Sequence, residues 1–465
     1  MASPRESRPD VPPPHAPPGD YGLRSKVLSP LEVLGQSVSG IAPTLTPAIT
    51  IPLVFQLSGN GTWLAYVLAT FGILLVAWCI GQFARHSAAP GSLYSYAAGT
   101  LPPWLAAVVA WSLFLAYIAT ASSSIGGFYH YCGIFLRRGG EPVFAVLIAA
   151  FMTWVSMWIS WRDVKLSARL MFWIEAISVF MIFIVVMLVL VRHGFRVDTD
   201  QLRLRGVTPS GFRFGLVLAL YSFAGFESST AMGVEAQNPF HTIPRAVLQS
   251  AILAGAFFTL CSYAETLGLR TAGADLGSSQ SPFHVLSVVG GVPFFGALID
   301  ICLVVSLFSG ALACITAGSR VLLQMAHDGL LPGQLHKTHR HHRTPHRAIA
   351  ISGAASLLPA AILAARGDSG LDVYGWLGSL GTYGFIAAYG LVSLAVFIAL
   401  RDRSVPGLEA RIIPIAAVVA MVLTFLGTLY SLPAGPYGKL PFVYLAYLAM
   451  GMIWFAFRRR RSEAK

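Results

Sequence analysis

The residues best suited to chemistry lie in the apolar stretch from Gly215 to Pro239, where Gly225 and Glu227 stand near the middle. A glycine there weakens a helix and frees backbone groups that lipid cannot pair. A carboxylate at that depth needs a partner or a water-filled cavity. Discontinuous helices of this kind hold polar solutes near the middle of the membrane in secondary transporters. A kinked packing helix, with Glu227 bonded to a neighbour, fits the same residues equally well.

A second unusual stretch runs from Gly35 to Pro47, inside another apolar segment. Gly40 and Pro43 weaken or remove helical hydrogen bonds there. If the helix unwinds from Ser39 to Ala42, the amides that open its second half converge on one spot. That helix end carries a partial positive charge, which suits a carboxylate. A proline-kinked packing helix is again the simpler alternative.

The composition places the whole chain in a membrane. It has 465 residues, of which 55% are hydrophobic and 11% charged, whereas a soluble domain carries about 25% charged residues. The net charge of +12 resides in loops and tails, so it does not indicate a nucleic-acid partner. The five cysteines lack the spacing of a disulfide framework or a metal site. No nucleophile motif, phosphate loop or carboxylate pair suggests an enzyme or a bound cofactor.

Twelve apolar segments, each about 17–25 residues or longer, predict an all-α integral membrane protein with twelve transmembrane helices. Residues 1–28 form a Pro-rich tail without an apolar core, so we expect a disordered cytoplasmic tail and no signal peptide. The segments are Leu31–Phe55, Trp63–Gln82, Trp104–Gly127, Val143–Trp161, Leu170–Val191, Phe214–Val234, Ala246–Leu269, Val292–Met325, Ala348–Ala365, Tyr374–Leu400, Ile412–Leu432 and Phe442–Phe457.

The two unusual stretches fall in segments one and six. These segments are the first spans of two inverted five-span repeats, which cover about residues 29–191 and 213–400. Residues 411–457 add two further spans. The repeats and these spans together form one domain at residues 29–457. A cytoplasmic N-terminus puts most of the 32 lysines and arginines on the inner side, including the basic tail at 458–465. Five basic residues from Arg192 to Arg213 then lie outside, and the sequence suggests no role for them.

Four stretches make the chain resemble an amino-acid permease of the amino acid–polyamine–organocation (APC) superfamily. They are Ser37–Pro43, Pro90–Tyr96, Phe223–Arg245 with its FAGFE, EAQNP and TIPR motifs, and Ser319–Arg347. The resemblance covers about residues 28–457. It implies the LeuT-type five-plus-five inverted repeat, with helices 1 and 6 broken, and it favours a transport site over two packing kinks.

The resemblance also implies a substrate site built on the two breaks. The amides of Ser39, Gly40 and Ile41 would receive a substrate carboxylate. Carbonyls near the span-one and span-six breaks would take an ammonium group, and an aromatic residue after the second break would close over the substrate. The residues implied for these further roles are Gln36, Ser37, Ser222, Phe223, Ala224, Gly225 and Phe226, with Tyr117 and Tyr383 as wall residues for which a packing role is the alternative.

The coupling ion is open between a proton and sodium. Some proton-coupled relatives keep a lysine in span five near the position of Ser178, but this span has none. Glu175 lies about one turn earlier on the same face. Glu175 or Glu227 could exchange a proton, which we favour, with Glu265 and Asp300 as candidate partners. In the sodium alternative, span-one carbonyls and Ser306 or Ser309 bind the ion.

We therefore expect a secondary transporter that imports amino acids across the cytoplasmic membrane by alternating access, with both termini cytoplasmic. The alternatives are an amine or polyamine carrier, an exchanger of two metabolites, or a protein that binds a ligand without transport. The loop from His336 to Arg343 is interpreted as facing lipid headgroups rather than a metal. The sequence does not identify the substrate.

Overall fold

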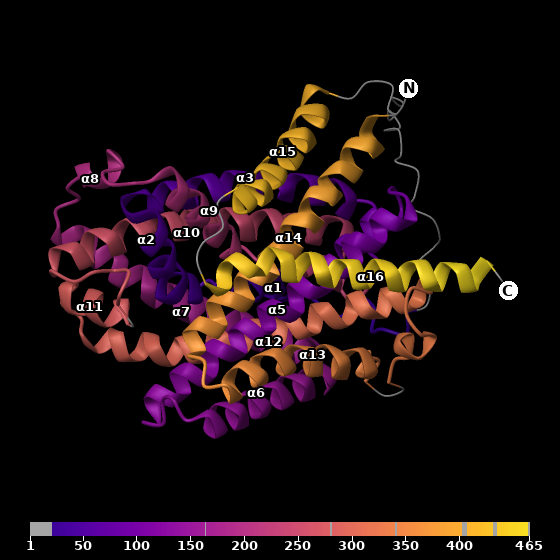
Figure 1. Cartoon of the computed structure of the whole chain (residues 1–465), viewed down its shortest axis with the longest axis horizontal. Helices are drawn as coiled ribbons and strands as arrows, with labels where there is room; N and C mark the ends of the chain where they lie inside the picture. The colour runs from indigo at the N-terminus through magenta and orange to yellow at the C-terminus, as the bar shows by residue number, and fades with distance from the viewer. Residues whose placement is uncertain are drawn as a thin grey trace, which may run out of the picture.

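The computed structural model describes residues 21–162, 164–279, 281–339, 342–401, 407–430 and 435–463. Within them the chain is helical apart from loops and one isolated bridge between Leu28 and Ala236 (Figure 1). The first 20 residues of the expected N-terminal tail lie outside the described residues. So do Arg340 and His341 of the histidine-rich loop, and residues 464 and 465 of the basic tail.

Long apolar helices make up most of the molecule, and short ones occur at breaks and in loops. The long helices are α3 (Thr62–Ala84), α5 (Pro103–Phe135), α6 (Pro142–Arg162), α7 (Val164–Arg192), α10 (Pro239–Thr271), α12 (Phe294–His327), α13 (His346–Ala365), α14 (Gly370–Arg401), α15 (Leu408–Tyr430) and α16 (Leu440–Glu463). The short ones are α1 (Pro30–Ile41), α2 (Ile51–Ser58), α4 (Leu93–Ala98), α8 (Thr199–Leu202), α9 (Pro209–Tyr221) and α11 (Pro282–Val289).

Ten segments of the described chain are long and apolar enough to cross a membrane. The first, Pro30–Ala84, has 55 residues. At about 1.5 Å per residue this is more than twice the thickness of a bilayer core, and it contains two of the segments expected from the sequence. The sixth expected segment is not among the ten, because α9 ends at Tyr221 and only a short 3₁₀ helix, η3 (Ser228–Met232), follows. The all-helical class is confirmed.

The first break lies later than the sequence suggested. Ser39, Gly40 and Ile41 are still helical, and the chain leaves the helix at Ala42, which has φ 47°. A π-helix, η1 (Thr46–Thr50), then leads into α2. The expectation of unwinding from Ser39 to Ala42 is therefore wrong. The reason is Pro43, which has no amide and disfavours helical geometry at the residue before it, whereas Gly40 alone does not end the helix.

The helices form two packed groups. In one group α10 packs on α3 and α1, and α9 packs on α2 and α3. In the other, α5 packs on α12, and α13 packs on α6, α5 and α12. Helix α14 lies against α5 over most of its length. The two breaks face each other where the groups meet.

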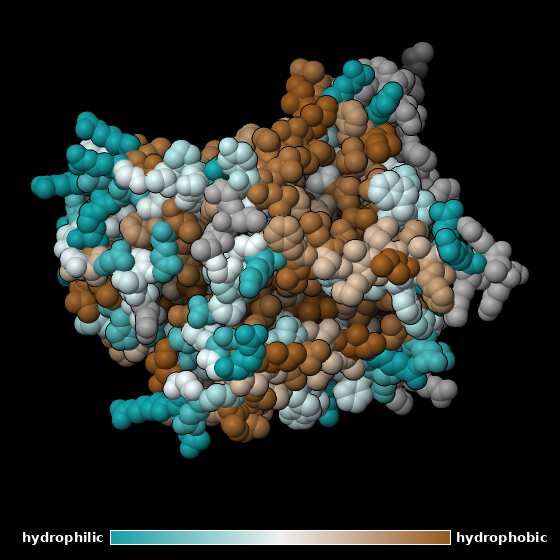
Figure 2. All heavy atoms as spheres, in the orientation of Figure 1, coloured by the Kyte–Doolittle hydropathy of each residue, from teal (hydrophilic) through white to brown (hydrophobic). Residues whose placement is uncertain are grey.

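The surface is apolar around the middle of the molecule and polar at its two ends (Figure 2). Large apolar side chains inside the long helices are exposed, among them Phe71 of α3, Trp154 of α6, Leu423 of α15 and Ile453 of α16. Such a continuous apolar band is typical of a surface in contact with lipid. We call the polar end that carries Tyr21, His327 and Arg458 the terminal face, and the end that carries α8 and α11 the opposite face (Figure 1).

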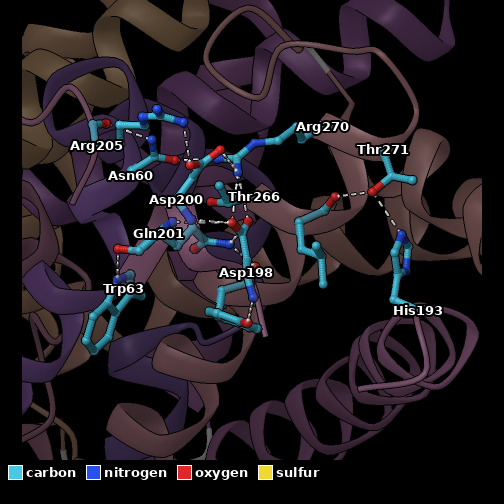
Figure 3. Close-up of polar contacts among 12 residues, drawn as sticks. Asn60, Trp63, His193, Asp198, Asp200, Gln201, Arg205, Thr266, Arg270 and Thr271 are labelled. Atoms are coloured by element: carbon cyan, nitrogen blue, oxygen red, sulfur yellow. Dashed lines mark hydrogen bonds and ion pairs between the residues drawn. The ribbon is translucent and has the colours of Figure 1, made fainter. Parts of the chain in front are cut away.

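A polar cluster on the opposite face contains part of the basic loop from Arg192 to Arg213 and pairs some of its charges (Figure 3). Arg270 at the end of α10 contacts the carboxylate of Asp198 at 2.9 Å, and Arg205 contacts Asp200 at 3.1 Å. The side-chain amide of Gln201 donates to Asp198 at 3.0 Å. The loop is thus tied to α10 by compensated charges.

The same cluster predicts a pH dependence of stability. Burial raises the pKa of Asp198, but the hydrogen bonds of Gln201, the charge of Arg270 and the Asp200 amide outweigh it and hold that pKa below its usual value. The carboxylate therefore adds stability above about pH 4, and this contribution is lost as the pH falls through the folded-state pKa.

We expect the thermal unfolding midpoint to fall more steeply from about pH 7 to about pH 3 in the wild type than in Asp198→Asn. Parallel curves for the two proteins would contradict this assignment.

Candidate functional site

A small cavity lies between the two helix breaks. Its walls come from α1, η1, the turn after α9, α5, α12 and α14. No charged side chain is among the lining residues in the described part of the chain. The lining residues are Gly40, Ile41, Ala42, Leu45, Thr46, Thr120, Ser124, Tyr221, Ser222, Ala224, Gly310 and Tyr374.

Two tyrosines close the cavity on the side of the opposite face. The rings of Tyr221 and Tyr374 meet edge to face, with centroids 5.9 Å apart. The Tyr221 hydroxyl donates to Ser123 at 2.8 Å, and the Ser123 hydroxyl donates to the carbonyl of Tyr374 at 2.6 Å. The hydroxyls of Thr50 and Tyr374 are 3.2 Å apart. These bonds join α9, α5, α14 and η1 above the cavity.

The backbones of the two breaks touch at a pair of glycines. A Cβ atom on Gly40 would lie 2.6 Å from the carbonyl oxygen of Gly225. A Cβ atom on Gly225 would lie 2.7 Å from the carbonyl oxygen of Gly40, and Gly225 has φ 88°. Only glycine at both positions allows this approach.

Glu227 is a buried carboxylate held by two tyrosines. The hydroxyl of Tyr117 in α5 donates to it at 2.8 Å, and that of Tyr389 in α14 donates at 2.5 Å. Phe226 packs on the ring of Tyr389, with centroids 5.3 Å apart. Glu227 thus fixes the second break to α5 and α14 and does not line the cavity.

Removing one of these donors is expected to destabilise the protein. Tyr389→Phe leaves one oxygen of the buried Glu227 without its donor, and we expect a loss of about 1.5–3 kcal/mol. The matched control is Tyr447→Phe, because the buried Tyr447 hydroxyl has no hydrogen-bond partner among the residues that the structure describes. Thermal unfolding in lipid nanodiscs measures both. An equal midpoint for the two variants would contradict the role given to Tyr389.

Glu175 in α7 forms a second buried carboxylate site next to the first break. The hydroxyls of Thr44 and Ser306 donate to it at 3.1 Å and 2.5 Å. Ser309 lies one turn after Ser306 in α12, and its buried hydroxyl has no hydrogen-bond partner in the described structure. Ser178 is also buried on α7. The carboxylate of Glu175 thus joins α7 and α12 to the turn after α1.

Toward the terminal face, a fully buried ion pair crosses between the two helix groups. Two nitrogens of Arg320 in α12 contact the two oxygens of Glu235, which follows η3, each at 2.9 Å. The amide of Leu28 donates to the carbonyl of Glu235 at 2.8 Å, which ties the start of the described chain to the same segment. A second pair joins Glu32 of α1 to Arg169 of α7 at 2.9 Å.

Breaking the buried pair is expected to be costly. Glu235→Gln leaves Arg320 buried without its counter-ion, and we expect a loss of about 3–5 kcal/mol. Glu141→Gln is the matched control, because its pair with Arg138 is exposed at 3.9 Å and should cost about 0–1 kcal/mol. Denaturation in detergent compares the two, and similar midpoints would contradict the expectation for Arg320.

Comparison with known proteins decides the family. The sequence profile described as "Amino acid permease" matches residues 32–463. The chain belongs to the amino acid permease family. The permease is therefore a multi-pass membrane transporter and not an enzyme.

Individual relatives cover most of the permease. It is 26% identical over 427 residues to the methylthioribose transporter of Bacillus subtilis (strain 168), covering 87% of each chain. It is 25% identical to the branched-chain amino acid permease BcaP of the same organism, covering 74% of this chain and 75% of the relative. It is 26% identical to the low-affinity putrescine importer PlaP of Escherichia coli (strain K12), covering 72% and 74%.

A solved structure shows the same fold. The permease superposes on MhsT in complex with L-phenylalanine with a TM-score of 0.56 at 15% identity, covering 87% of this chain and 99% of MhsT. The fold is the LeuT fold, as the resemblance implied.

The structure brings some of the residues expected at the site to the cavity and places others elsewhere. Gly40, Ile41, Ser222 and Ala224 line it, and Gly225 abuts Gly40. Phe223 and Phe226 are fully buried and pack on other aromatic rings.

The polar groups of Gln36 and Ser37 join the two breaks. Ser37 donates to the carbonyl of Phe226 at 2.7 Å, and the Gln36 carbonyl accepts from Ser228 at 2.9 Å. The buried hydroxyl of Ser39 has no hydrogen-bond partner in the described structure.

The expectations for four side chains are corrected. Tyr117 is not a cavity wall, because it is directed to Glu227. Tyr383 packs on Phe425 and Tyr444 and lines a different pocket, between α2, α9, α14 and α15.

Asp300 pairs with His284 at 3.1 Å, and Glu265 has no hydrogen-bond partner in the described structure. Neither is therefore a partner of Glu175 or Glu227.

The sequence reading missed several lining residues: Ala42, Leu45, Thr46, Thr120, Ser124, Tyr221, Gly310 and Tyr374. The run Ser122–Ser124 inside an apolar helix was an available signal for a polar wall in α5. Tyr221 directly precedes the span-six break and was a second signal. Gly310 and Tyr374 gave none, because only packing shows which face of α12 and α14 meets the breaks.

Proposed function

We propose that the permease imports an amino acid across the cytoplasmic membrane by proton symport, with alternating access to the cavity between the two breaks. The observation that carries this proposal is the uncharged lining of that cavity. A zwitterion needs no charged side chain there, because helix ends can neutralise both of its groups.

The ends of the broken helices match the two charges of an amino acid. Helix α1 ends at Gly40 and Ile41, so its last carbonyls point to the cavity and suit an ammonium group. The backbone carbonyls of Ser222 and Ala224 lie in a turn rather than in a helix, and they add further acceptors for the ammonium group. The amide of Thr46, the first residue of η1, opens the second half of the span and suits a carboxylate, whereas the Leu45 amide already donates to the carbonyl of Ala42 at 2.9 Å.

The same lining argues against a polyamine. A substrate with two or more ammonium groups needs carboxylates in the pocket, and Glu227 already accepts from two tyrosines. The relatives are named for different substrates: BcaP for branched-chain amino acids, PlaP for putrescine, and the Bacillus subtilis methylthioribose transporter for methylthioribose.

Glu175 supports the proton as the coupling ion. Its two hydroxyl donors are Thr44 of the first break and Ser306 of α12. A change in the protonation of the carboxylate can therefore strengthen or weaken the contact between the break and α12. Sodium is the second candidate, because the buried hydroxyl of Ser309 has no hydrogen-bond partner in the described part of the chain and is available as an ion ligand.

For the topology we propose twelve crossings, with the terminal face in the cytoplasm. The ten continuous segments account for eleven crossings, because Pro30–Ala84 passes twice, and α9 with η3 adds the twelfth. The repeats then span about 29–191 and 213–400, followed by the spans at 411–457. Arg458 and the arginines after it support a cytoplasmic location of the terminal face, because basic residues next to membrane spans favour the inner side.

Uptake into proteoliposomes tests the proposal. A panel of labelled amino acids and amines is supplied under an inward proton gradient, an inward sodium gradient or none. Accumulation of one amino-acid class driven by protons supports the proposal. Accumulation driven only by sodium indicates that sodium is the coupling ion and favours Ser306 and Ser309 as its ligands. Exchange without accumulation indicates an exchanger, polyamine uptake indicates an amine carrier, and binding without flux contradicts transport.

A further inference from the structure

Glu265 is a buried carboxylate for which the proposed transport site has no use. It lies in α10, six residues before the helix ends at Thr271, and its side chain is fully buried. Neither of its oxygens has a hydrogen-bond partner in the described part of the chain. By contrast, Glu175, Glu227 and Glu235 each accept from two or more donors.

The surroundings of Glu265 are mainly apolar. Phe258, Cys261 and Glu265 share one face of α10, since they are spaced three, four and seven positions apart. Tyr66 of α3 meets Phe258 edge to face, with ring centroids 6.0 Å apart. Both Tyr66 and Cys261 lie within electrostatic range of the Glu265 carboxylate. The carboxylate therefore sits between α10 and α3, in an environment that favours its neutral form when no counter-ion is present.

No counter-ion reaches Glu265 from the elements packed against α10, within the residues described. Glu32 of α1 pairs with Arg169, and Glu175 of α7 is held by Thr44 and Ser306. The remaining charged groups also have partners elsewhere. Arg192 of α7 donates to the carbonyl of Val289, and His284 of α11 pairs with Asp300. Glu227, which precedes η3, accepts from Tyr117 and Tyr389.

Two contacts connect this pocket to the second break. The hydroxyl of Tyr66 lies 3.1 Å from that of Ser222, which lines the cavity. Phe258 packs on Phe223 in the same turn, with ring centroids 5.3 Å apart. A rearrangement of the turn after α9 therefore changes the environment of Glu265 through side chains already in contact.

We propose that Glu265 is a second proton-binding site of the permease, separate from Glu175, which gains and releases a proton as the turn between α9 and η3 rearranges. A charged carboxylate at this place is costly, and a proton removes that cost. A metal ion would need several oxygen ligands, whereas the described surroundings bring only the Tyr66 hydroxyl near. Proton binding here is independent of the proposed function, and only its link to flux depends on it.

Infrared spectroscopy of the full chain in nanodiscs tests proton binding directly. Spectra are recorded from about pH 5 to about pH 9, in the range of carboxyl C=O stretching. We expect the pH-dependent carboxyl bands of the wild type to include one that is lost in Glu265→Gln and kept in Glu175→Gln and in the matched control Asp300→Asn. Glu265→Asp keeps a carboxyl group and should shift that band rather than remove it. The same set of pH-dependent bands in the wild type and in Glu265→Gln overturns the proposal.

The link to the cavity has its own readout. Addition of a mixture of the standard L-amino acids should change the Glu265 band in the wild type, and the change should be at least about threefold smaller in Tyr66→Phe, since that variant lacks the bond to Ser222. An equal change in both proteins overturns the link.

Flux then separates this inference from the proposed function. Glu265→Gln should flatten the dependence of uptake on external pH. If wild-type uptake does not depend on the proton gradient, the proposed function is wrong. The infrared result then still shows whether Glu265 binds a proton. If wild-type uptake follows the gradient and Glu265→Gln keeps the same pH profile, only the present inference fails.

Discussion

Replacing Gly40 or Gly225 by alanine is expected to lower uptake by about tenfold or more while the protein still reaches the membrane. The added Cβ would lie 2.6–2.7 Å from a carbonyl oxygen of the other break, which is closer than any ordinary contact. Relief of such overpacking costs about 1–3 kcal/mol, and each 1.4 kcal/mol is a factor of ten in an equilibrium. Gly225→Ala is also strained by its positive φ, so it should be the more severe of the two.

Gly81→Ala is the matched control. Gly81 is a buried glycine of α3, and apart from its chain neighbours and the backbone of its own helix no atom of the described residues lies within 4 Å of the position that its Cβ would take. Initial uptake rates, divided by the amount of protein in the membrane, compare the three variants. Wild-type uptake by Gly40→Ala would remove the basis for placing the substrate between the two breaks.

Replacing Glu175 by glutamine is expected to abolish proton-driven accumulation and to spare exchange. The amide has nearly the same shape and can still accept from Thr44 and Ser306, but it cannot gain or lose a proton. The energy of the gradient is then no longer coupled to the substrate, so accumulation should fall by about tenfold or more. Counterflow with preloaded substrate needs no proton and should continue.

Two further variants make this expectation specific. Asp300→Asn removes another carboxylate of the membrane region, one that pairs with His284 away from the cavity, and it should keep wild-type accumulation. Ser309→Ala tests the alternative ion, because a sodium site at α12 would lose a ligand. Accumulation that survives in Glu175→Gln and fails in Ser309→Ala would replace the proton by sodium.

Contacts between the helix groups lie on both sides of the cavity. The pairs of Glu235 with Arg320 and of Glu32 with Arg169 hold the terminal side together. The bonds around Tyr221 and Tyr374 hold the opposite side. In the alternating access that we propose, passage of a substrate requires one of these two sets of contacts to open at a time.

Some features of the molecule follow from local sequence. Long apolar runs predict membrane helices, because a backbone in lipid must satisfy its own hydrogen bonds. Glycine next to a carboxylate at Gly225 and Glu227, and glycine with proline at Gly40 and Pro43, predict interrupted helices, because these residues weaken or remove the bonds of a helical ladder. The all-helical class and the approximate places of both interruptions were therefore available from the sequence.

Which side chains meet was decided only by the tertiary structure. Glu227 was suspected of binding a partner, but its donors Tyr117 and Tyr389 are 110 and 162 residues away. Tyr374 reaches the cavity and Tyr383 does not, although both are tyrosines of α14. The physical reason is that composition determines how much apolar surface a helix must bury, whereas the rotation of each helix depends on ridges and grooves contributed by all its neighbours. A binding site assembled from several helices therefore appears only once they are packed.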